Sequence, residues 1–203
     1  HNFRPDYLKL PQYQQELQIP QVLLLTATAT TSVIDDMAEK FGLLADDIQV
    51  TGFYRPNLNL LVEGISEKNK LAFLQNWLFH KARFKPMFRN EVRDKKNNDN
   101  HIAPTIVYVT LQHTAEEVAA ALNHSGFHAK AYHAGLDSEK RHIIQTEFMA
   151  GHVEIIVATI AFGMGIDKAN IRNVIHFDLP KSIENYSQEI GRAGRDGKPS
   201  DCL

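Results

Sequence analysis

Short apolar runs alternate with stretches of helical periodicity along most of this chain. The runs predict strands at residues 22–25, 105–110, 129–132, 154–159 and 173–177. Apolar positions three and four residues apart predict helices that begin near residues 31, 66, 114, 137 and 182. Strands that alternate with helices of this length indicate an α/β fold, in which helices cover both faces of a mainly parallel sheet.

Several helix ends are marked by specific residues. Gly42 is expected to stop the first helix, because glycine readily adopts the left-handed conformation that follows many helices. Thr114 and Glu117 have the spacing of a capping box, and Asp137 is expected to cap the helix that runs to Met149.

Two segments interrupt the periodicity. Residues 53–57, Phe-Tyr-Arg-Pro-Asn, indicate a hinge between two structural units. Residues 81–104 are predicted to form a flexible, turn-rich loop. Its first part holds seven basic residues, Lys81, Arg83, Lys85, Arg89, Arg93, Lys95 and Lys96. Such a segment could bind a nucleic-acid backbone or could be ordinary solvated surface.

Composition narrows the class of protein. Of the 203 residues 43% are hydrophobic, which is enough for a core, and no stretch approaches the length of a membrane span. The net charge of -2 provides no global basic field, so nucleic-acid binding would depend on local groups. The single cysteine, Cys202, resembles a strand residue and excludes an internal disulfide. A reducing cytoplasm or nucleus is therefore the expected location, rather than secretion.

The run Gln-Glu-Ile-Gly-Arg-Ala-Gly-Arg-Asp-Gly at residues 188–197 carries the strongest chemical signal. Arg192 and Arg195 stand three residues apart beside glycines, and Gln188 would share a face with them if the run were helical. Guanidinium groups stay charged in proteins and present forked donors that match phosphate oxygens. The run indicates either a phosphate clamp that includes an arginine finger or an ordinary solvated turn.

Polar clusters follow three of the predicted strands. Residues 26–30 follow the first strand, residues 132–135 the third and residues 159–167 the fourth. Ligands of open α/β sheets bind beyond the carboxyl ends of the strands. We therefore expect these clusters to lie together at one edge of the sheet, where backbone N–H and hydroxyl groups can bind phosphates.

Five motifs, in this order, resemble those of superfamily 2 helicases and of the RecQ family of DNA helicases in particular. Thr-Ala-Thr-Ala-Thr at residues 26–30 resembles motif III, and Ala-Thr-Ile-Ala-Phe-Gly-Met-Gly-Ile-Asp at residues 158–167 resembles motif V. Residues 188–197 resemble motif VI, and the segments 53–57 and 132–136 lie between these motifs as in the family. The resemblance covers nearly the whole chain apart from about residues 84–103.

The resemblance implies an ATP-dependent helicase that moves 3′ to 5′ along single-stranded DNA and separates duplex DNA. Such motors have two RecA-like lobes, each a three-layer α/β/α fold, with ATP and Mg²⁺ between them. Residues 1–54 would be the C-terminal part of the first lobe, and residues 55–203 the second lobe. Neither a G-x-x-x-x-G-K-[ST] loop nor a DEAH box occurs in the sequence. The remainder of the first lobe is therefore the expected partner, and the 203 residues alone are expected to be inactive.

The resemblance also implies roles for individual residues. Arg192 and Arg195 would reach the γ-phosphate, with Arg195 as the arginine finger and Gln188 in support. Asp167 and Gly165 would face the nucleotide, and no metal ligand is expected in this chain. The remaining implied roles are DNA contact, by Phe3, Arg4, His133 and Thr159, and coupling of nucleotide state to DNA grip, by Thr26 and Thr28.

Ordinary structural roles remain open for several of these residues. Thr26 and Thr28 are suited to cap a helix, Asp167 to cap a turn, and His133 to be buried with its hydrogen bonds satisfied. Phe3 could be an isolated exposed aromatic residue. The chain also departs from the family at residues 110–113, where Thr-Leu-Gln-His replaces a common Ser-Arg pair. That departure puts one DNA contact in doubt, and the basic segment could compensate for it.

Two other functions stay open beside a DNA helicase. An RNA helicase or translocase would use the same two lobes, and a degenerate lobe would serve as a non-catalytic nucleic-acid-binding module. Phe3 and the run Gly-Met-Gly-Ile-Asp at residues 163–167 favour the DNA branch. The intact Arg192 and Arg195 argue against a degenerate lobe.

Overall fold

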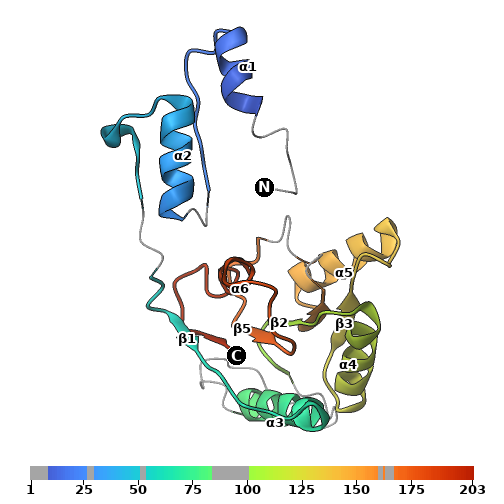
Figure 1. Cartoon of the computed structure of the whole chain (residues 1–203). Helices are drawn as coiled ribbons and strands as arrows, with labels where there is room; N and C mark the ends of the chain where they lie inside the picture. The colour runs from blue at the N-terminus through green and yellow to red at the C-terminus, as the bar shows by residue number, and fades with distance from the viewer. Residues whose placement is uncertain (1–8, 27–29, 51–53, 84–100, 160–161, 163–166) are drawn as a thin grey trace. The chain divides into compact units, whose positions relative to one another are not determined.

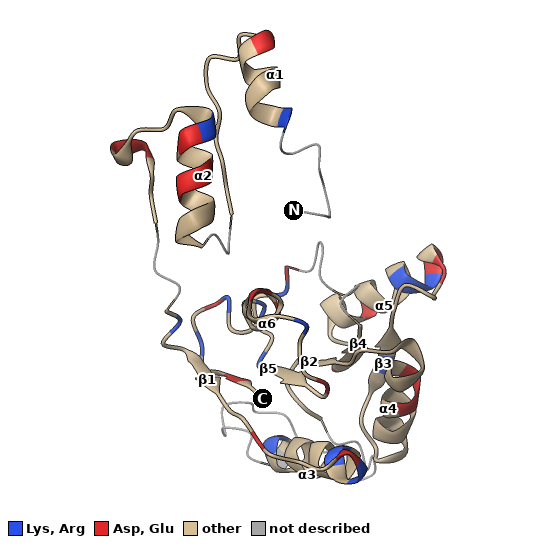
Figure 2. Ribbon diagram, viewed as in Figure 1, with Lys and Arg blue, Asp and Glu red and all other residues tan. Residues whose placement is uncertain are grey.

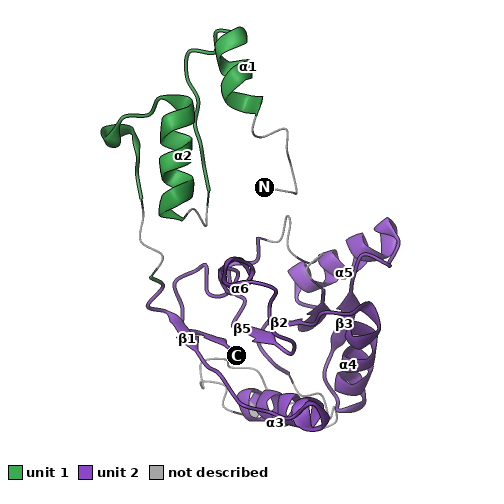
Figure 3. Ribbon diagram, in the orientation of Figure 1, with its two compact units in different colours: residues 1–54 green, residues 55–203 purple. Residues whose placement is uncertain are grey.

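The computed structural model describes residues 9–26, 30–50, 54–83, 101–159, 162 and 167–203. The chain divides into two compact units, His1–Tyr54 and Arg55–Leu203 (Figure 3). The boundary falls inside the segment 53–57. The assignment of the two units to the two lobes of a helicase stays a prediction.

Unit 2 is built on a parallel sheet with the strand order β1-β6-β5-β2-β4-β3 (Figure 1). The central strand β2 pairs with β4 on one side and β5 on the other, with Ile106 opposite Ile156 and Val174. Four of the predicted strands are confirmed as β2 to β5, and Cys202 lies in β6 as expected, whereas β1 has no counterpart in the sequence prediction. The bounds are β1 Leu58–Leu60, β2 Thr105–Tyr108, β3 Ala129–Tyr132, β4 Ile155–Ala158, β5 Asn173–His176 and β6 Ser200–Cys202.

Alternate side chains of the central strand point to opposite faces of the sheet, as the pleat of a strand requires. Val107 packs in a core cluster with residues of α3 and α4, whereas Ile106 packs in a second cluster with residues of α5 and α6. The four helices are α3 Lys70–Arg83, α4 Gln112–His124, α5 Ser138–Ala150 and α6 Ile183–Ile190. The predicted α/β fold with three layers is therefore confirmed.

Most of the predicted helix ends are also confirmed. Gly42 follows α2, Thr31–Phe41, in the left-handed conformation with φ 64°. The Asp137 carboxylate accepts a hydrogen bond from the Lys140 backbone N–H at 2.8 Å, and so caps α5. The predicted capping box of α4 is wrong, because this helix already begins at Gln112, directly after the extended Leu111. Thr114 therefore lies inside the first turn rather than before it.

Unit 1 contains the helices α1, Leu10–Glu16, and α2, and the 3₁₀ turn η2, Ala45–Asp47. The predicted strand at residues 22–25 is wrong. These residues form no strand, and Leu23 and Leu25 are 80% and 82% exposed. An apolar run becomes a buried strand only where a neighbouring strand binds its backbone and another layer covers its side chains. The described residues of unit 1 supply neither.

The predicted loop at residues 81–104 is partly wrong. α3 continues to Arg83, and the Lys81 Nζ lies 2.5 Å from an Asp201 carboxylate oxygen on β6, so the first residues of the segment are helical and anchored. Residues 84–100, with the other five basic side chains, lie outside the described residues. Just before β2, the Ile102 backbone N–H donates to the Glu154 carboxylate at 3.2 Å.

Charged side chains of both signs are spread over the described parts of both units (Figure 2). On α2, for example, the Lys40 Nζ lies 2.8 Å from Asp36. In the part of the chain that the structure describes, no helix has both the length and the apolar character needed to cross a bilayer.

Candidate functional site

The carboxyl ends of β2 to β5 lie at one edge of the sheet, because all the strands are parallel. Backbone hydrogen bonds join these ends directly. The Thr159 N–H donates to the Tyr132 carbonyl at 3.2 Å, and the Phe177 N–H donates to the Tyr108 carbonyl at 2.9 Å. The prediction that the polar clusters beginning at Tyr132 and Thr159 lie together at one edge of the sheet is therefore confirmed. Thr26 belongs to unit 1 and follows no strand of this sheet, so the position of its cluster beside the other two stays a prediction.

The arginine segment, residues 191–197, leaves α6 and continues in tight turns. α6 ends at Ile190, so Gln188, Arg192 and Arg195 do not share one helical face as the sequence suggested. Further along the segment, Gly194 adopts a left-handed φ of 53° and donates its N–H to the Ile171 carbonyl at 2.9 Å. Glycine adopts this conformation readily, and the turn at Gly194 places the segment against the loop that precedes β5.

Arg192 is half-buried against Tyr108, the last residue of β2. Burial raises the pKa of the Tyr108 hydroxyl to about 12, although the charge and hydrogen bond of Arg192 act in the opposite direction. The hydroxyl therefore stays neutral, and it donates to the Phe162 carbonyl at 3.3 Å. The Arg192 Nε is buried without a hydrogen-bond partner. A buried donor of this kind is suited to a ligand acceptor.

Arg195 lies near the surface and pairs with Asp167. The Arg195 Nη1 is 2.8 Å from the Asp167 Oδ1, and the two side chains are 39% and 86% exposed. An exposed ion pair of this kind contributes little to stability, so an anionic ligand can replace the carboxylate. Gln188 is exposed on α6. The structure thus brings Asp167 and Arg195 together.

His133 and Thr159 are both buried, at 4% and 8% exposure. The His133 Nε2 lies 3.1 Å from the Glu116 carboxylate, whereas its Nδ1 is buried without a partner. The alternative that His133 is simply buried with its hydrogen bonds satisfied therefore holds for the Nε2 but not for the Nδ1.

Four of the sequence-predicted site residues, Phe3, Arg4, Thr28 and Gly165, lie outside the described residues. Thr26 is exposed, and the N-cap of α2 is Thr30, so capping of that helix does not account for Thr26.

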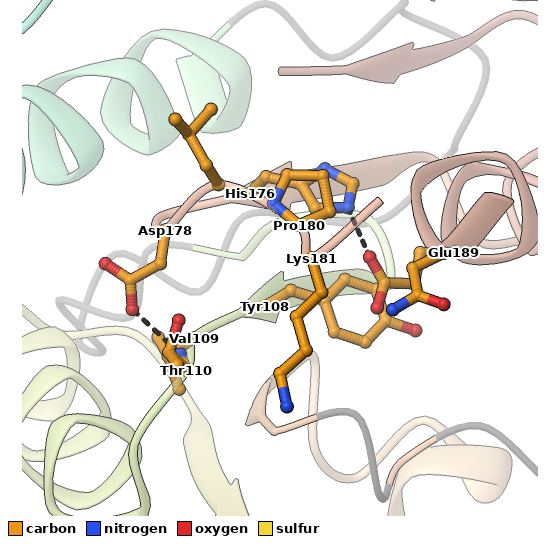
Figure 4. Close-up of a pocket in the computed structure, with 10 residues that line it drawn as sticks. Tyr108, Val109, Thr110, His176, Asp178, Pro180, Lys181 and Glu189 are labelled. Carbon is orange, nitrogen blue, oxygen red and sulfur yellow. Dashed lines mark hydrogen bonds and ion pairs between the residues drawn. The ribbon is translucent and has the colours of Figure 1, made fainter. Parts of the chain in front are cut away.

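A buried pair that the sequence did not single out lies between the strand ends and the arginine segment. The His176 Nε2, at the end of β5, is 2.8 Å from the Glu189 carboxylate on α6 (Figure 4). The His176 ring stacks on Tyr108 with a centroid distance of 5.4 Å and contacts Tyr186 at 5.1 Å. These residues adjoin a small cavity of about 70 Å³ that Asp178 also lines. His176 could have been singled out in the sequence because it lies near the end of a predicted strand. Nothing in the sequence indicated that it pairs with Glu189.

No cluster of three potential metal ligands occurs among the residues that the structure describes. Cys202 is buried in β6, and burial raises the pKa of its thiol to about 12. A thiol that stays protonated is a poor nucleophile and a poor metal ligand.

Comparison with known proteins shows the family to which this chain belongs. Residues 87–197, more than half of the chain, match the family described as the helicase conserved C-terminal domain. The whole chain is 40% identical to rat ATP-dependent DNA helicase Q5 over 213 residues, and 36% identical to the ATP-dependent DNA helicase RecQ of Pasteurella multocida over 206. It is 38% identical over 202 residues to the mouse bifunctional 3′-5′ exonuclease/ATP-dependent helicase WRN. The chain spans 20%, 29% and 13% of these relatives, respectively.

Among solved structures, the E. coli DEAD-box protein SrmB, crystallised with regulator of ribonuclease activity A, has a similar fold. The TM-score is 0.52 with 24% identity, over 66% of this chain and 68% of that one. This likeness concerns the fold, and it agrees with the expected RecA-like architecture. The chain belongs to the family of helicase conserved C-terminal domains, and over its whole length it is similar to DNA helicases of the RecQ type.

Proposed function

We propose that this chain forms the arginine-bearing part of an ATP-dependent DNA helicase that moves 3′ to 5′ on single-stranded DNA and unwinds duplexes. The observation that carries the proposal is the arginine segment beside the carboxyl edge of the sheet. There Arg192 has a buried Nε without a partner, and the Nη1 of Arg195 faces an exposed carboxylate. Two guanidinium groups held in this way are suited to the charge of a triphosphate.

In this proposal the arginines act on the γ-phosphate. Charge grows on the phosphoryl oxygens during transfer, and fixed positive groups stabilise that charge without having to reorganise. Arg195 would exchange Asp167 for a phosphate oxygen, which carries more charge, and Gln188 would support it. The described residues do not form a Mg²⁺ site, so we propose that the metal is held by the triphosphate and by the remainder of the first lobe.

We further propose that residues 1–54 belong to the first lobe and residues 55–203 to the second. DNA would contact His133 and Thr159 at the sheet edge, and Phe3 could stack on a base while Arg4 pairs with a phosphate. The protein would act where DNA is found, in the bacterial cytoplasm or the nucleus.

Strand displacement by the full-length protein tests this function. Matched DNA and RNA duplexes with a 3′ or a 5′ single-stranded tail would be offered with ATP. We expect displacement from DNA with a 3′ tail. Preferential unwinding of RNA would instead support an RNA helicase, and displacement of neither with intact nucleic-acid binding would support a non-catalytic module.

The isolated 203-residue chain is expected to show no ATP hydrolysis, with or without single-stranded DNA. The reason is that no phosphate-binding G-x-x-x-x-G-K-[ST] loop occurs in its sequence. A steady-state assay of phosphate release beside the full-length protein checks this expectation. DNA-stimulated turnover by the isolated chain would contradict it.

The basic segment is expected to strengthen DNA binding. Reversal of Lys85, Arg89, Arg93, Lys95 and Lys96 to Glu in the full-length protein should lower single-stranded DNA affinity about tenfold or more and flatten its salt dependence, because fewer counterions are released. Fluorescence anisotropy at several salt concentrations measures both effects. A control with Lys68 and Lys130 reversed, both exposed elsewhere on unit 2, should change affinity less. If the five-residue variant binds single-stranded DNA as tightly as the unchanged protein, the segment has no role in DNA binding.

A further inference from the structure

Two residues at the start of unit 2 bind the backbone of the arginine segment. The Arg55 Nη2 donates to the carbonyl of Ala193 at 3.0 Å and to that of Gly194 at 2.8 Å. The Asn57 Nδ2 donates to the Gly194 carbonyl at 2.9 Å and to the Lys198 carbonyl at 3.0 Å. The first two carbonyls lie between Arg192 and Arg195, so these bonds hold the backbone that carries both arginines.

Arg55 and Asn57 are themselves held in place. The Leu58 N–H donates to the Arg55 carbonyl at 3.0 Å, which closes a turn with Pro56 inside it. Proline fixes its own φ and restricts the residue before it, so the turn has little freedom. The Asn57 carbonyl accepts the Ser200 N–H at 2.9 Å, and the Arg55 Nε donates to the Asn57 side chain at 3.3 Å. Both side chains are half-buried.

The approach of Asn57 to the segment is close enough to require a glycine. A Cβ on Gly194 would lie 2.5 Å from the Asn57 Nδ2 and 2.7 Å from the Lys198 carbonyl oxygen. On the other side of this residue, the Gly194 N–H donates to the Ile171 carbonyl at 2.9 Å. The segment is thus held from two directions at the residue before Arg195.

The arginine side chains keep unused donor capacity. The Arg192 side chain contacts Tyr108, but its Nε has no partner. The Arg195 side chain is 39% exposed, with contacts to Asp167 and, at 3.5 Å, to the Gly191 carbonyl. The backbone of the segment fixes where both side chains start.

We propose that Arg55 and Asn57 are positioning residues that place Arg192 and Arg195 for the nucleotide, an inference that rests on the proposed function. Arg55 directly follows Tyr54, the last residue of unit 1, so the arginine segment is anchored at the point where the chain passes between the units. The segment 53–57 thus connects the two units and also contributes two side chains that hold the arginine segment.

Asn57→Ala in the full-length protein tests this role. We expect kcat for DNA-stimulated ATP hydrolysis to fall about 10- to 100-fold, with KM for ATP changed by less than about threefold, because a misplaced group loses transition-state stabilisation more than ground-state binding. Asn59→Ala is the matched control, since Asn59 lies two residues further along, in β1, and its side chain donates to Asp201 at 3.0 Å. Its kcat should stay near that of the unchanged protein.

A double-mutant cycle with Arg195→Ala separates positioning from a general loss of structure. If Asn57 acts through Arg195, adding Asn57→Ala to Arg195→Ala should lower kcat little further, whereas a fully additive loss would overturn the proposal. An unchanged kcat in Arg195→Ala would overturn the proposed function instead. A large loss in Arg195→Ala with equal activity of Asn57→Ala and Asn59→Ala would overturn the positioning role alone.

Thermal unfolding shows whether Asn57→Ala folds. If it does not, Arg55→Lys takes its place, because lysine keeps the charge but has one nitrogen and cannot donate both to the two carbonyls, as Nη2 does, and to Asn57, as Nε does. A kcat about tenfold lower in a folded Arg55→Lys protein supports the role, since displacement of a positioned group is costly. An unchanged kcat overturns it.

Discussion

Arg195→Ala in the full-length protein is expected to lower kcat for ATP hydrolysis by about 10³- to 10⁵-fold, the range known for arginine fingers. Arg195 is near the surface, it pairs with the exposed Asp167, and the backbone beside it is held by Arg55 and Asn57. Its removal should therefore leave the fold intact and remove charge stabilisation in the transition state. Single-turnover hydrolysis with saturating ATP and DNA measures this loss.

Lys198→Ala is the control for this substitution. Lys198 is a basic, exposed residue three positions after Arg195, and the carbonyl that it offers to Asn57 belongs to the backbone. Its replacement removes one positive charge from the same segment and should change kcat by less than about threefold, as an exposed charge outside the site contributes little. Similar losses in the two variants would mean that Arg195 acts through the general field rather than as a finger.

Gly194→Ala is expected to destabilise unit 2 by about 3 kcal/mol, because a left-handed backbone and a close contact are both involved. The residue has a φ of 53°, and a Cβ would meet the Asn57 side chain, the Lys198 carbonyl and the Ser200 hydroxyl within 2.7 Å. One of these contacts is backbone, which cannot rotate away. Denaturant unfolding of the 203-residue chain, followed by the fluorescence of its single tryptophan, Trp77 in unit 2, measures the change.

Gly197→Ala separates strain from crowding. Gly197 lies in the same segment with a φ of 76°, but nothing lies within 4 Å of its added Cβ. Only the cost of the left-handed backbone remains there, about 1 kcal/mol. Equal destabilisation by the two substitutions would show that Asn57 and Lys198 do not crowd Gly194.

Much of the fold follows from local pattern. The strands β2, β4 and β5 are largely buried, and their β-branched and apolar residues form runs that the sequence displays directly. Asp137 and Gly42 mark helix ends through hydrogen-bonding and backbone preferences that act within a few residues. Local preference failed at residues 22–25, where an apolar run is exposed, because burial depends on neighbours rather than on the run itself.

The candidate site was only partly predictable. Arg192 and Arg195 were identified from residue type and spacing, which can be read directly from the sequence. Their surroundings could not be predicted in this way. The helix ends before the two arginines, and the hydrogen bonds from Arg55 and Asn57 join segments far apart in the chain. The buried pair of His176 and Glu189 likewise joins a strand end to a helix, and no spacing rule relates them.

The sequence by itself determined the α/β class, the order of the motifs and the residues that can bind phosphate, because these depend on periodicity and side-chain chemistry. The tertiary structure alone decided that the arginine segment turns at Gly194, that Tyr108 lies against Arg192, and that residues of the hinge hold the segment's carbonyls. Hydrogen bonds between distant segments depend on three-dimensional proximity. That proximity results from the assembly of the whole sheet, in which β1 and β6 pair although they come from the two ends of unit 2, so no local pattern encodes it.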